Sequence, residues 1–273
     1  MNALKRLLSL ALLVMACSTV TGQGLTLLGG LLTLNDDPLS YENLRGPVKE
    51  MELLDMSVYE DGETTIWDTI YLLFNEDGQI LQRNCFMHAE YPYIKYLYTN
   101  GRLTEEKWWN NYDSIRRQYH YSPNGCLSYA VEFYYEEGEQ KIYDTNQYHC
   151  DSLCRVTMQI YNHFQDTVRC TYDENGRMTK WCNWERCEEG CDGCTTFIYN
   201  SQGLLVKEQS RHRYSNGDKE YIYNEKGFVS TYIDNFTGEE NTTHYEYTYD
   251  SYDNWVTRRN DNNFIIRKIT YYE

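Results

Sequence analysis

The chain has 273 residues, 28 of them tyrosine and only four proline, and a formal net charge of −16, so it is long enough for one large domain or two small ones. An acidic chain lacks the basic face that nucleic-acid binding needs, which argues against a nucleic-acid partner. Tyrosine favours strands and carries a hydroxyl that needs a hydrogen-bond partner, so the composition predicts an all-β protein.

The N-terminus has the pattern of an export signal. Lys5 and Arg6 precede an apolar run over Leu7–Ala16. A run of this length is typical of the apolar part of a signal peptide and is too short to cross a bilayer. We therefore expect an exported protein of the periplasm, the cell surface or the extracellular space.

Two processing routes remain open for this signal. Ordinary cleavage would remove residues 1–22, whereas lipoprotein processing would remove residues 1–16 and attach lipid to Cys17, then the only link to a membrane. Residues 23–43 are predicted to be a lead-in segment. Residues 44–273 are predicted to form a single β-repeat domain.

One short pattern recurs along most of this domain. It opens with an aromatic residue, continues with polar residues and a glycine, and ends in an apolar stretch, as in YDENGRMTK from Tyr172. Eight copies follow one another at intervals of 23 to 27 residues, and their opening residues are Phe74, Tyr98, Tyr121, Tyr148, Tyr172, Tyr199, Tyr223 and Tyr249. The glycines, which suit the positive φ of a tight hairpin turn, are Gly78, Gly101, Gly125, Gly176, Gly203 and Gly227.

Each copy is predicted to supply two antiparallel strands of a continuous meander. Tyr245, Tyr247 and Tyr249 alternate with polar residues and share one face of a strand. A second turn in each copy, such as Tyr214–Asp218, returns the chain. Roughly 16 strands would coil into a curved or spiral sheet with its tyrosine face inward. We expect free edges at both ends, with Leu44–Tyr59 as the first strands or a cap.

These copies resemble YD repeats, the motif of Rhs proteins, teneurins and the shells of bacterial toxin complexes. The likeness covers roughly residues 70–273, and the pattern Y-D-x-x-G-x-[LM] is met closely at Tyr172–Met178. The resemblance implies hairpins wound into a spiral sheet. It also implies a small exported member, without the autoproteolytic segment and toxin domain that large members carry.

The cysteines suggest disulfides. If a hairpin turn centres on Gly138, Cys126 faces Cys150 across two strands, and Cys154 competes with Cys150 for the same role. A second group could form disulfides, stay as free thiols or bind zinc, and disulfides are favoured; it consists of Cys182, Cys187, Cys191 and Cys194. We expect no metal and no cofactor.

No catalytic motif stands out, so the chain is not predicted to be an enzyme. The six histidines are scattered, and the glycines are explained by turns. The only indication of binding comes from tryptophans, whose rings can stack on sugars or fill a partner's pocket, although packing between strands explains them too. They are Trp108, Trp109, Trp181 and Trp184.

The predicted function is that of an exported cell-envelope or extracellular scaffold, which recognises a glycan or an envelope protein through its sheet surface. One alternative is a hydrolase with acidic residues on the concave face. Another is an accessory remnant of an Rhs toxin system.

Overall fold

The computed structural model describes residues 44–59, 63–85, 93–109, 114–136, 139–161, 166–183, 193–212, 215–235, 239–261 and 263–273. The predicted signal, Cys17 and the lead-in segment lie outside these residues. The described residues form strands and turns, and they contain no helix suited to crossing a membrane.

Nineteen strands follow one another along the described part of the chain. They are β1 (Val48–Val58), β2 (Thr64–Phe74), β3 (Ile80–Cys85), β4 (Tyr93–Thr99), β5 (Arg102–Trp109), β6 (Ser114–Tyr121), β7 (Leu127–Glu136), β8 (Glu139–Cys150), β9 (Val156–Tyr161), β10 (Asp166–Tyr172), β11 (Met178–Asn183), β12 (Cys194–Tyr199), β13 (Leu205–His212), β14 (Ser215–Tyr223), β15 (Val229–Asp234), β16 (Asn241–His244), β17 (Glu246–Tyr249), β18 (Trp255–Arg259) and β19 (Asn263–Tyr271). The all-β prediction is confirmed.

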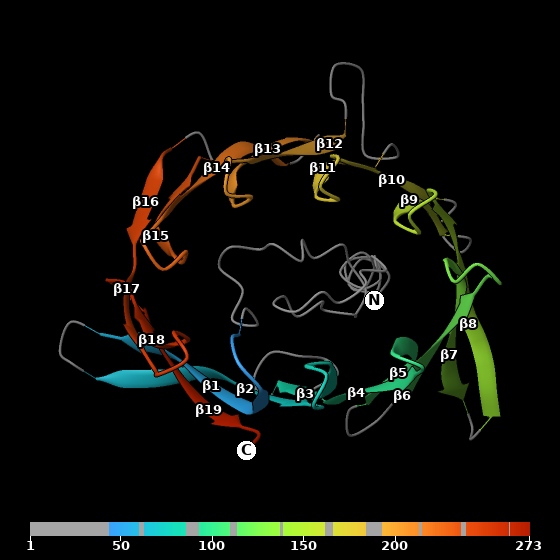
Figure 1. Ribbon diagram of the computed structural model, residues 1–273, viewed down its shortest axis with the longest axis horizontal. Coiled ribbons are helices and arrows are strands. Elements are labelled where there is room, and N and C mark those ends of the chain that lie inside the picture. Colours follow the sequence, from blue (N-terminus) through green and yellow to red (C-terminus); the bar gives the residue numbers. More distant parts are fainter. Residues whose placement is uncertain are drawn as a thin grey trace.

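The strands form one antiparallel sheet that bends into a ring (Figure 1). Except at β16 and β17, each strand pairs with the next in the chain, and β1 pairs with both β2 and β19. The expectation of free edges at both ends is therefore wrong. Twist coils the sheet until its first and last strands meet, and their pairing satisfies backbone groups that would otherwise be exposed edges.

The ring has one irregular place. β16 pairs with β15, and β17 pairs with β18, so the sheet continues there through the chain itself rather than through a strand pair. Between β16 and β17, the backbone N–H of Tyr245 donates to the carbonyl oxygen of Ser230 at 2.9 Å.

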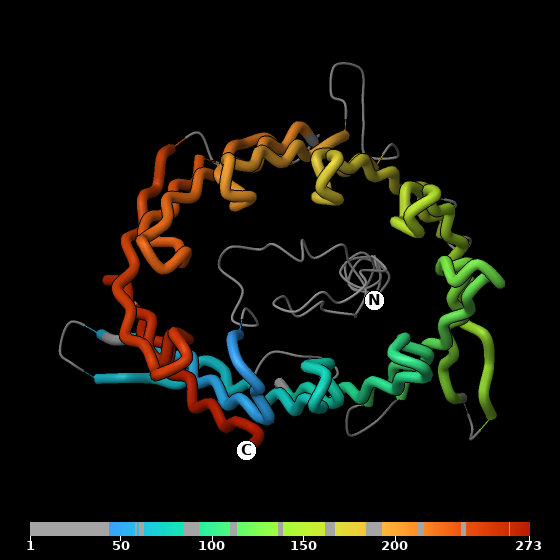
Figure 2. Tube along the Cα trace, viewed as in Figure 1, coloured from blue at the N-terminus to red at the C-terminus, as the bar shows by residue number. Residues whose placement is uncertain are grey.

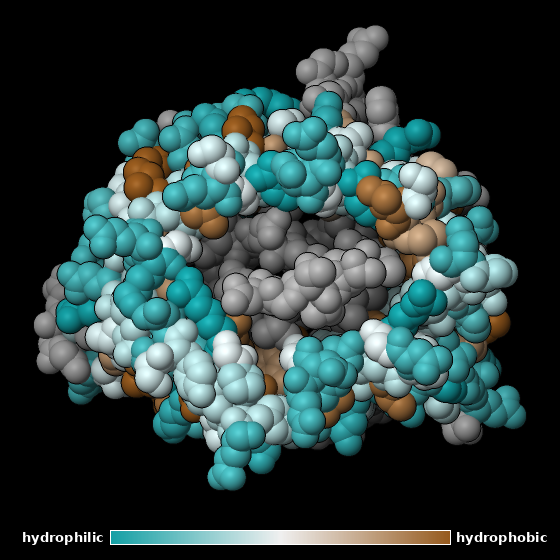
Figure 3. Space-filling model, viewed as in Figure 1, coloured by the Kyte–Doolittle hydropathy of each residue, from teal (hydrophilic) through white to brown (hydrophobic). Residues whose placement is uncertain are grey.

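The strands bury alternate residues on one face. On β2, Ile70, Leu72 and Phe74 are buried while their neighbours are partly exposed. The turns of the repeats curl toward the inside of the ring, as Figures 1 and 2 show. We call the face of the sheet that carries the buried residues the inner face, and the opposite face the outer face. The view in Figure 3 is mostly hydrophilic, with scattered hydrophobic residues. Each large apolar side chain that the ring buries contributes about 1.5–3 kcal/mol.

In six of the eight repeats, the polar residue directly after the opening position closes the turn. Its side-chain oxygen accepts hydrogen bonds from the backbone N–H groups two and four residues later, at 2.8 to 3.1 Å. Asp and Asn both offer such an oxygen. The residues in this role are Asn75, Asp151, Asp173, Asn200, Asn224 and Asp250. The six predicted turn glycines all have positive φ, from 74° to 89°.

This capping pattern shifts the fourth repeat by two residues. Because Asp151 caps the turn, the residue in the opening position is Cys150 rather than Tyr148. Tyr148 nevertheless belongs to the core, where it is buried. Cys154 stands in the glycine position with φ of 60°, as Asp253 does in the eighth repeat with φ of 61°. Sequence comparison of the repeats misses this shift because neither position carries its usual residue.

Tyrosine hydroxyls connect most repeats to the one before. Six of them donate to the carbonyl oxygen of the second residue after the glycine position of the preceding turn, at 2.5 to 2.9 Å. The donors are Tyr98, Tyr121, Tyr172, Tyr199, Tyr223 and Tyr247. We call this series the tyrosine ladder. At the closure of the ring, the hydroxyl of Tyr272 donates to the carbonyl oxygen of Phe74 at 2.7 Å.

The predicted turn at Tyr214–Asp218 is misplaced. β14 already begins at Ser215, and Gly217 pairs with Ser210 inside the β13–β14 ladder. The Asn-Gly pair, a strong turn signal on its own, here lies in a strand because the repeat on either side fixes the pairing.

Candidate binding surface

Trp108 and Trp109 point to opposite faces of β5, as neighbours on a strand must. Trp108 is buried on the inner face, where the guanidinium carbon of Arg117 lies 4.9 Å from the centre of its ring. Trp109 is half-buried on the outer face. Of these two tryptophans, only Trp109 offers ring surface to a ligand.

The ring of Trp109 belongs to an aromatic pair. Its cross-strand partner is Tyr93 on β4, and the two rings stack with centres 5.9 Å apart and planes 15° apart. The Nζ atom of Lys95 lies over the Trp109 ring, 5.5 Å from its centre. The pair thus presents a flat apolar surface with a cation beside it.

Three cations lie side by side next to this pair. Lys95 on β4 pairs with Lys107 on β5, and Lys107 pairs with Arg116 on β6. Like charges directly opposite each other destabilise a sheet, so this row needs compensation. We call Tyr93, Trp109 and these three cations the outer patch.

The carboxylate of Glu105 provides part of that compensation. It accepts a hydrogen bond from Nε of Arg116 at 2.7 Å and lies 3.0 Å from Nζ of Lys107. Burial opposes the ionisation of Glu105, but these two hydrogen bonds prevail and lower its pKa. Three cations against one carboxylate leave a local surplus of two positive charges, in a chain whose net charge is −16.

The other predicted tryptophans lie far along the chain. Trp181 on β11 is partly buried and packs against a core cluster that includes Cys170, Phe197 and Leu205. Trp184 lies outside the described residues. The structure therefore does not bring Trp181 into one site with Trp108 and Trp109.

The inner face carries a row of charged residues across four strands. Glu106 pairs with Arg117, Arg117 with Glu132, and Glu132 with Asp144. All four residues are buried. Arg117 and Glu132 form an ion pair, in which Nε of Arg117 donates to Oε2 of Glu132 at 3.1 Å. A buried charge pair of this kind is costly to break from one side.

Glu106 differs from its neighbours in this row. It is fully buried, and neither carboxylate oxygen has a hydrogen-bond partner. Burial raises the pKa of Glu106 to about 8, although the positive charge of Arg117 opposes the shift. Glu106 is therefore protonated at neutral pH, while Glu132 holds the arginine. This difference between two carboxyl groups is one that acid–base catalysis can use.

Two disulfides are formed by predicted cysteines. Cys182 and Cys194 face each other on β11 and β12 and are bonded, which uses two of the four residues considered for zinc. Cys187 and Cys191 lie outside the described residues. Cys126 is bonded to Cys154, and Cys150 is a thiol. Within the described residues, no group of three or more Cys, His, Asp or Glu could hold a metal ion.

The register explains why Cys154 rather than Cys150 is bonded to Cys126. Near the turn, the β7–β8 pairing is shifted by one residue from the predicted register, and after a β-bulge it follows that register from Glu132–Asp144 to Tyr129–Gln147. Cys126 lies before β7, in the turn of the third repeat, so it has no partner in that ladder. Its side chain instead meets the next turn, where Cys154 is located.

Comparisons with known proteins leave the family open. No family model and no curated protein matches the chain. Among solved structures, the TcdB2–TccC3–Cdc42 complex is similar over 74% of this chain and 12% of its own, with 12% identity and a TM-score of 0.37. A porin-like protein from Bacteroides uniformis is similar over 83% of this chain and 99% of its own, with 10% identity and a TM-score of 0.40.

A second porin-like protein, from Bacteroides vulgatus, covers 80% of this chain and 97% of its own at 10% identity, with a TM-score of 0.26. The chain thus spans only a small part of the first of these structures and nearly the whole of the other two. At these TM-scores none of the likenesses carries an argument about function. The resemblance to YD repeats stays a prediction from the sequence.

Sequence reasoning identified Trp109 but missed the rest of the outer patch. Lys95, Lys107 and Arg116 lie on three successive strands, and only the β4–β6 register makes them neighbours. Alternation along LTEEKWW does predict that Lys107 shares a face with Trp109. That signal could have added a cation to the predicted site.

Proposed function

We propose that this protein is an exported β-repeat scaffold that binds an acidic glycan through its outer patch. The observation that carries the proposal is the stacked Tyr93–Trp109 pair beside the cation row of Lys95, Lys107 and Arg116. Aromatic faces stack on sugar rings, and lysine and arginine pair with carboxylates. Neither feature alone would favour a sugar acid, whereas the two together do.

Export is supported by two features. The N-terminal pattern of charged and apolar residues is that of a signal peptide. The Cys126–Cys154 and Cys182–Cys194 disulfides are compatible with an oxidising compartment. A repeat ring outside the cell would give the outer patch direct access to envelope or extracellular polysaccharides.

The binding test uses the purified exported protein and three polymers: a polyuronate, a neutral glucan and polyglutamate. Calorimetry should show binding to the polyuronate, with much weaker binding to the other two, because only the polyuronate offers both sugar rings and carboxylates. Trp109→Ala should weaken that binding by tenfold or more, and Lys95→Ala by several-fold at low salt.

A matched control is available on β2. Trp67 is 46% exposed, and Trp67→Ala removes an exposed tryptophan outside the outer patch. It should leave binding unchanged. Equal binding of polyuronate and polyglutamate would indicate that the ligand is an acidic protein rather than a glycan. The proposal fails if Trp109→Ala binds the polyuronate as wild type does.

A hydrolase is the second candidate, favoured by the contrast between Glu106 and Glu132 on the inner face. A carboxyl group whose pKa is raised, in one row with a carboxylate that is paired with Arg117, could serve as acid and base. Both side chains are buried, however, and substrate would need a route to them. Hydrolysis of any of the three polymers, lost in Glu106→Gln, would establish this activity.

A further inference from the structure

In three of the repeats, the residue after the glycine position contacts two positions of the next repeat. Arg102, Arg155 and Arg177 occupy this place, and each guanidinium carbon lies 4.8 to 5.5 Å from the centre of the next opening tyrosine ring. The same arginine is also the neighbour of the next turn: a Cβ atom built on Gly203 would lie 3.2 Å from Nη1 of Arg177. One side chain thus reaches both the opening residue and the glycine position of the following repeat.

At the junction of the third and fourth repeats, cysteines occupy all three of these positions. Cys126 follows the turn glycine, Cys150 is the opening residue, and Cys154 stands in the glycine position. The repeat geometry therefore brings Cys126 next to both of the others. The disulfide takes the place of the arginine contact with the next turn, and the thiol of Cys150 takes the place of a tyrosine in the ladder.

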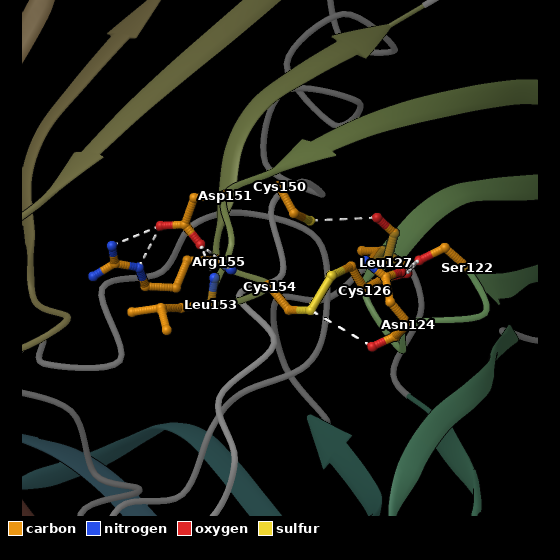
Figure 4. The surroundings of a disulfide bond; sticks show 9 residues. All are labelled: Ser122, Asn124, Cys126, Leu127, Cys150, Asp151, Leu153, Cys154 and Arg155. Atoms are coloured by element: carbon orange, nitrogen blue, oxygen red, sulfur yellow. Dashed lines mark hydrogen bonds and ion pairs between the residues drawn. A yellow bond between two sulfur atoms is a disulfide. The ribbon is translucent and has the colours of Figure 1, made fainter.

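The contacts of the three sulfurs agree with this placement (Figure 4). Cys126 and Cys154 are bonded, with their Cα atoms 4.7 Å apart. Sγ of Cys150 donates a hydrogen bond to the carbonyl oxygen of Leu127 at 3.4 Å, and Leu127 is the next residue in the chain after Cys126. Cys126 is buried, whereas Cys150 and Cys154 are both partly exposed.

We propose that Cys126 exchanges its disulfide partner between Cys154 and Cys150, and that the released thiol of Cys154 is an attachment site for small disulfides. The Cys150 thiolate attacks Sγ of Cys126 and forms the new bond. The Cys126–Cys154 bond breaks, and its electron pair leaves on Sγ of Cys154. The exchange needs no oxidant, because one disulfide and one thiol are present before and after it.

The exchange changes a part of the repeat that faces solvent. Cys154 lies in a turn, beside the exposed Ser152 and Leu153. Once released, its thiolate can attack a low-molecular-weight disulfide of the glutathione class. This step forms a mixed disulfide on Cys154 and releases one small thiolate. Cys170, another thiol among the described residues, is buried with its pKa raised to about 12 by burial, so it is a natural control.

The linkages can be distinguished by peptide mapping of the whole exported protein. Cleavage before Asp151 separates Cys150 from Cys154, so trypsin together with an Asp-specific protease gives a different cross-linked peptide for each bond. The protein is held at pH 8.5 in a glutathione redox buffer and then quenched with acid. We expect the Cys126–Cys150 linkage to rise from a trace to at least a tenth of the molecules. Glutathione should appear on Cys154 in parallel.

Two variants make the result decisive. Cys154→Ser should fold with a Cys126–Cys150 disulfide, and Cys170→Ser should leave the wild-type linkage ratio unchanged. The proposal is overturned if wild type keeps only the Cys126–Cys154 bond at every time point. It is equally overturned if folded Cys154→Ser, checked by circular dichroism, leaves Cys126 and Cys150 both open to alkylation.

Discussion

At the scale of single residues, tyrosine has two tasks in this protein. Its ring packs against the core on the inner face, and its hydroxyl donates to a backbone carbonyl of the preceding repeat. A buried hydroxyl must find such a partner, because leaving it unpaired costs free energy. This dual demand explains why tyrosine rather than phenylalanine opens most repeats.

Removing one ladder hydroxyl should therefore destabilise the fold modestly. Tyr172→Phe keeps the ring and deletes the 2.7 Å hydrogen bond to the carbonyl oxygen of Val156. We expect a loss of about 1 kcal/mol in the free energy of unfolding, measured in urea. Tyr252→Phe, on an exposed ring, should change stability little. Equal stability of Tyr172→Phe and wild type would contradict the role of the ladder.

The buried acid Glu106 should make stability depend on pH. The unfolded chain loses this proton near the ordinary pKa of a glutamate, whereas the folded chain keeps it until about pH 8. The folded state therefore loses stability as pH rises between these two values. Glu106→Gln should be similar to wild type near pH 4.5 and more stable by about 2–4 kcal/mol at pH 8.

Thermal unfolding from pH 4.5 to pH 8 checks this prediction. The informative quantity is the difference in stability between Glu106→Gln and wild type, followed as a function of pH. If this difference in stability were the same at every pH, the pKa of Glu106 would not be raised in the folded state.

At the scale of structural elements, the hairpin turn is the most predictable part of the molecule. Asp173 accepts backbone hydrogen bonds from Asn175 and Arg177 and also forms an ion pair with Arg177. Asn200 and Asn224 make the same backbone bonds without a carboxylate. The shared feature is the side-chain oxygen, and the charge is secondary.

Substitution at Asp173 should separate these two contributions. Asp173→Ala removes the acceptor and should cost about 1–2 kcal/mol of unfolding free energy, because two backbone N–H groups lose their partner. Asp173→Asn keeps the acceptor and should cost less than half of that, since ion pairs near the protein surface contribute little. Urea denaturation of both variants gives the comparison. Equal losses would assign the effect to the ion pair.

At the scale of the whole molecule, the sequence predicts the repeats but not their closure. The turn glycines and tyrosine alternation follow from local rules of backbone conformation and strand geometry. The pairing of β1 with β19 depends on the accumulated twist of all the strands between them, which no local pattern encodes. The cation row of Lys95, Lys107 and Arg116 depends in the same way on register between strands.

The closed ring also gives the chain its two distinct surfaces. The inner face buries apolar rings together with the row from Glu106 to Asp144, and the outer face keeps Trp109 and its cations accessible. An open sheet would leave two unpaired edges, which invite association with other chains. Closure is thus the property on which both the fold and the proposed binding surface depend.

A cross-link between β1 and β19 tests that closure most directly. Glu52 and Lys268 are partners in this pair of strands, and Nζ of Lys268 lies 2.9 Å from Oε2 of Glu52 on the exposed face. In the double variant Glu52→Cys and Lys268→Cys, mild oxidation followed by peptide mapping should find a disulfide between positions 52 and 268 in most molecules. If both new thiols remain open to alkylation while the Cys182–Cys194 bond is intact, the ring is not closed.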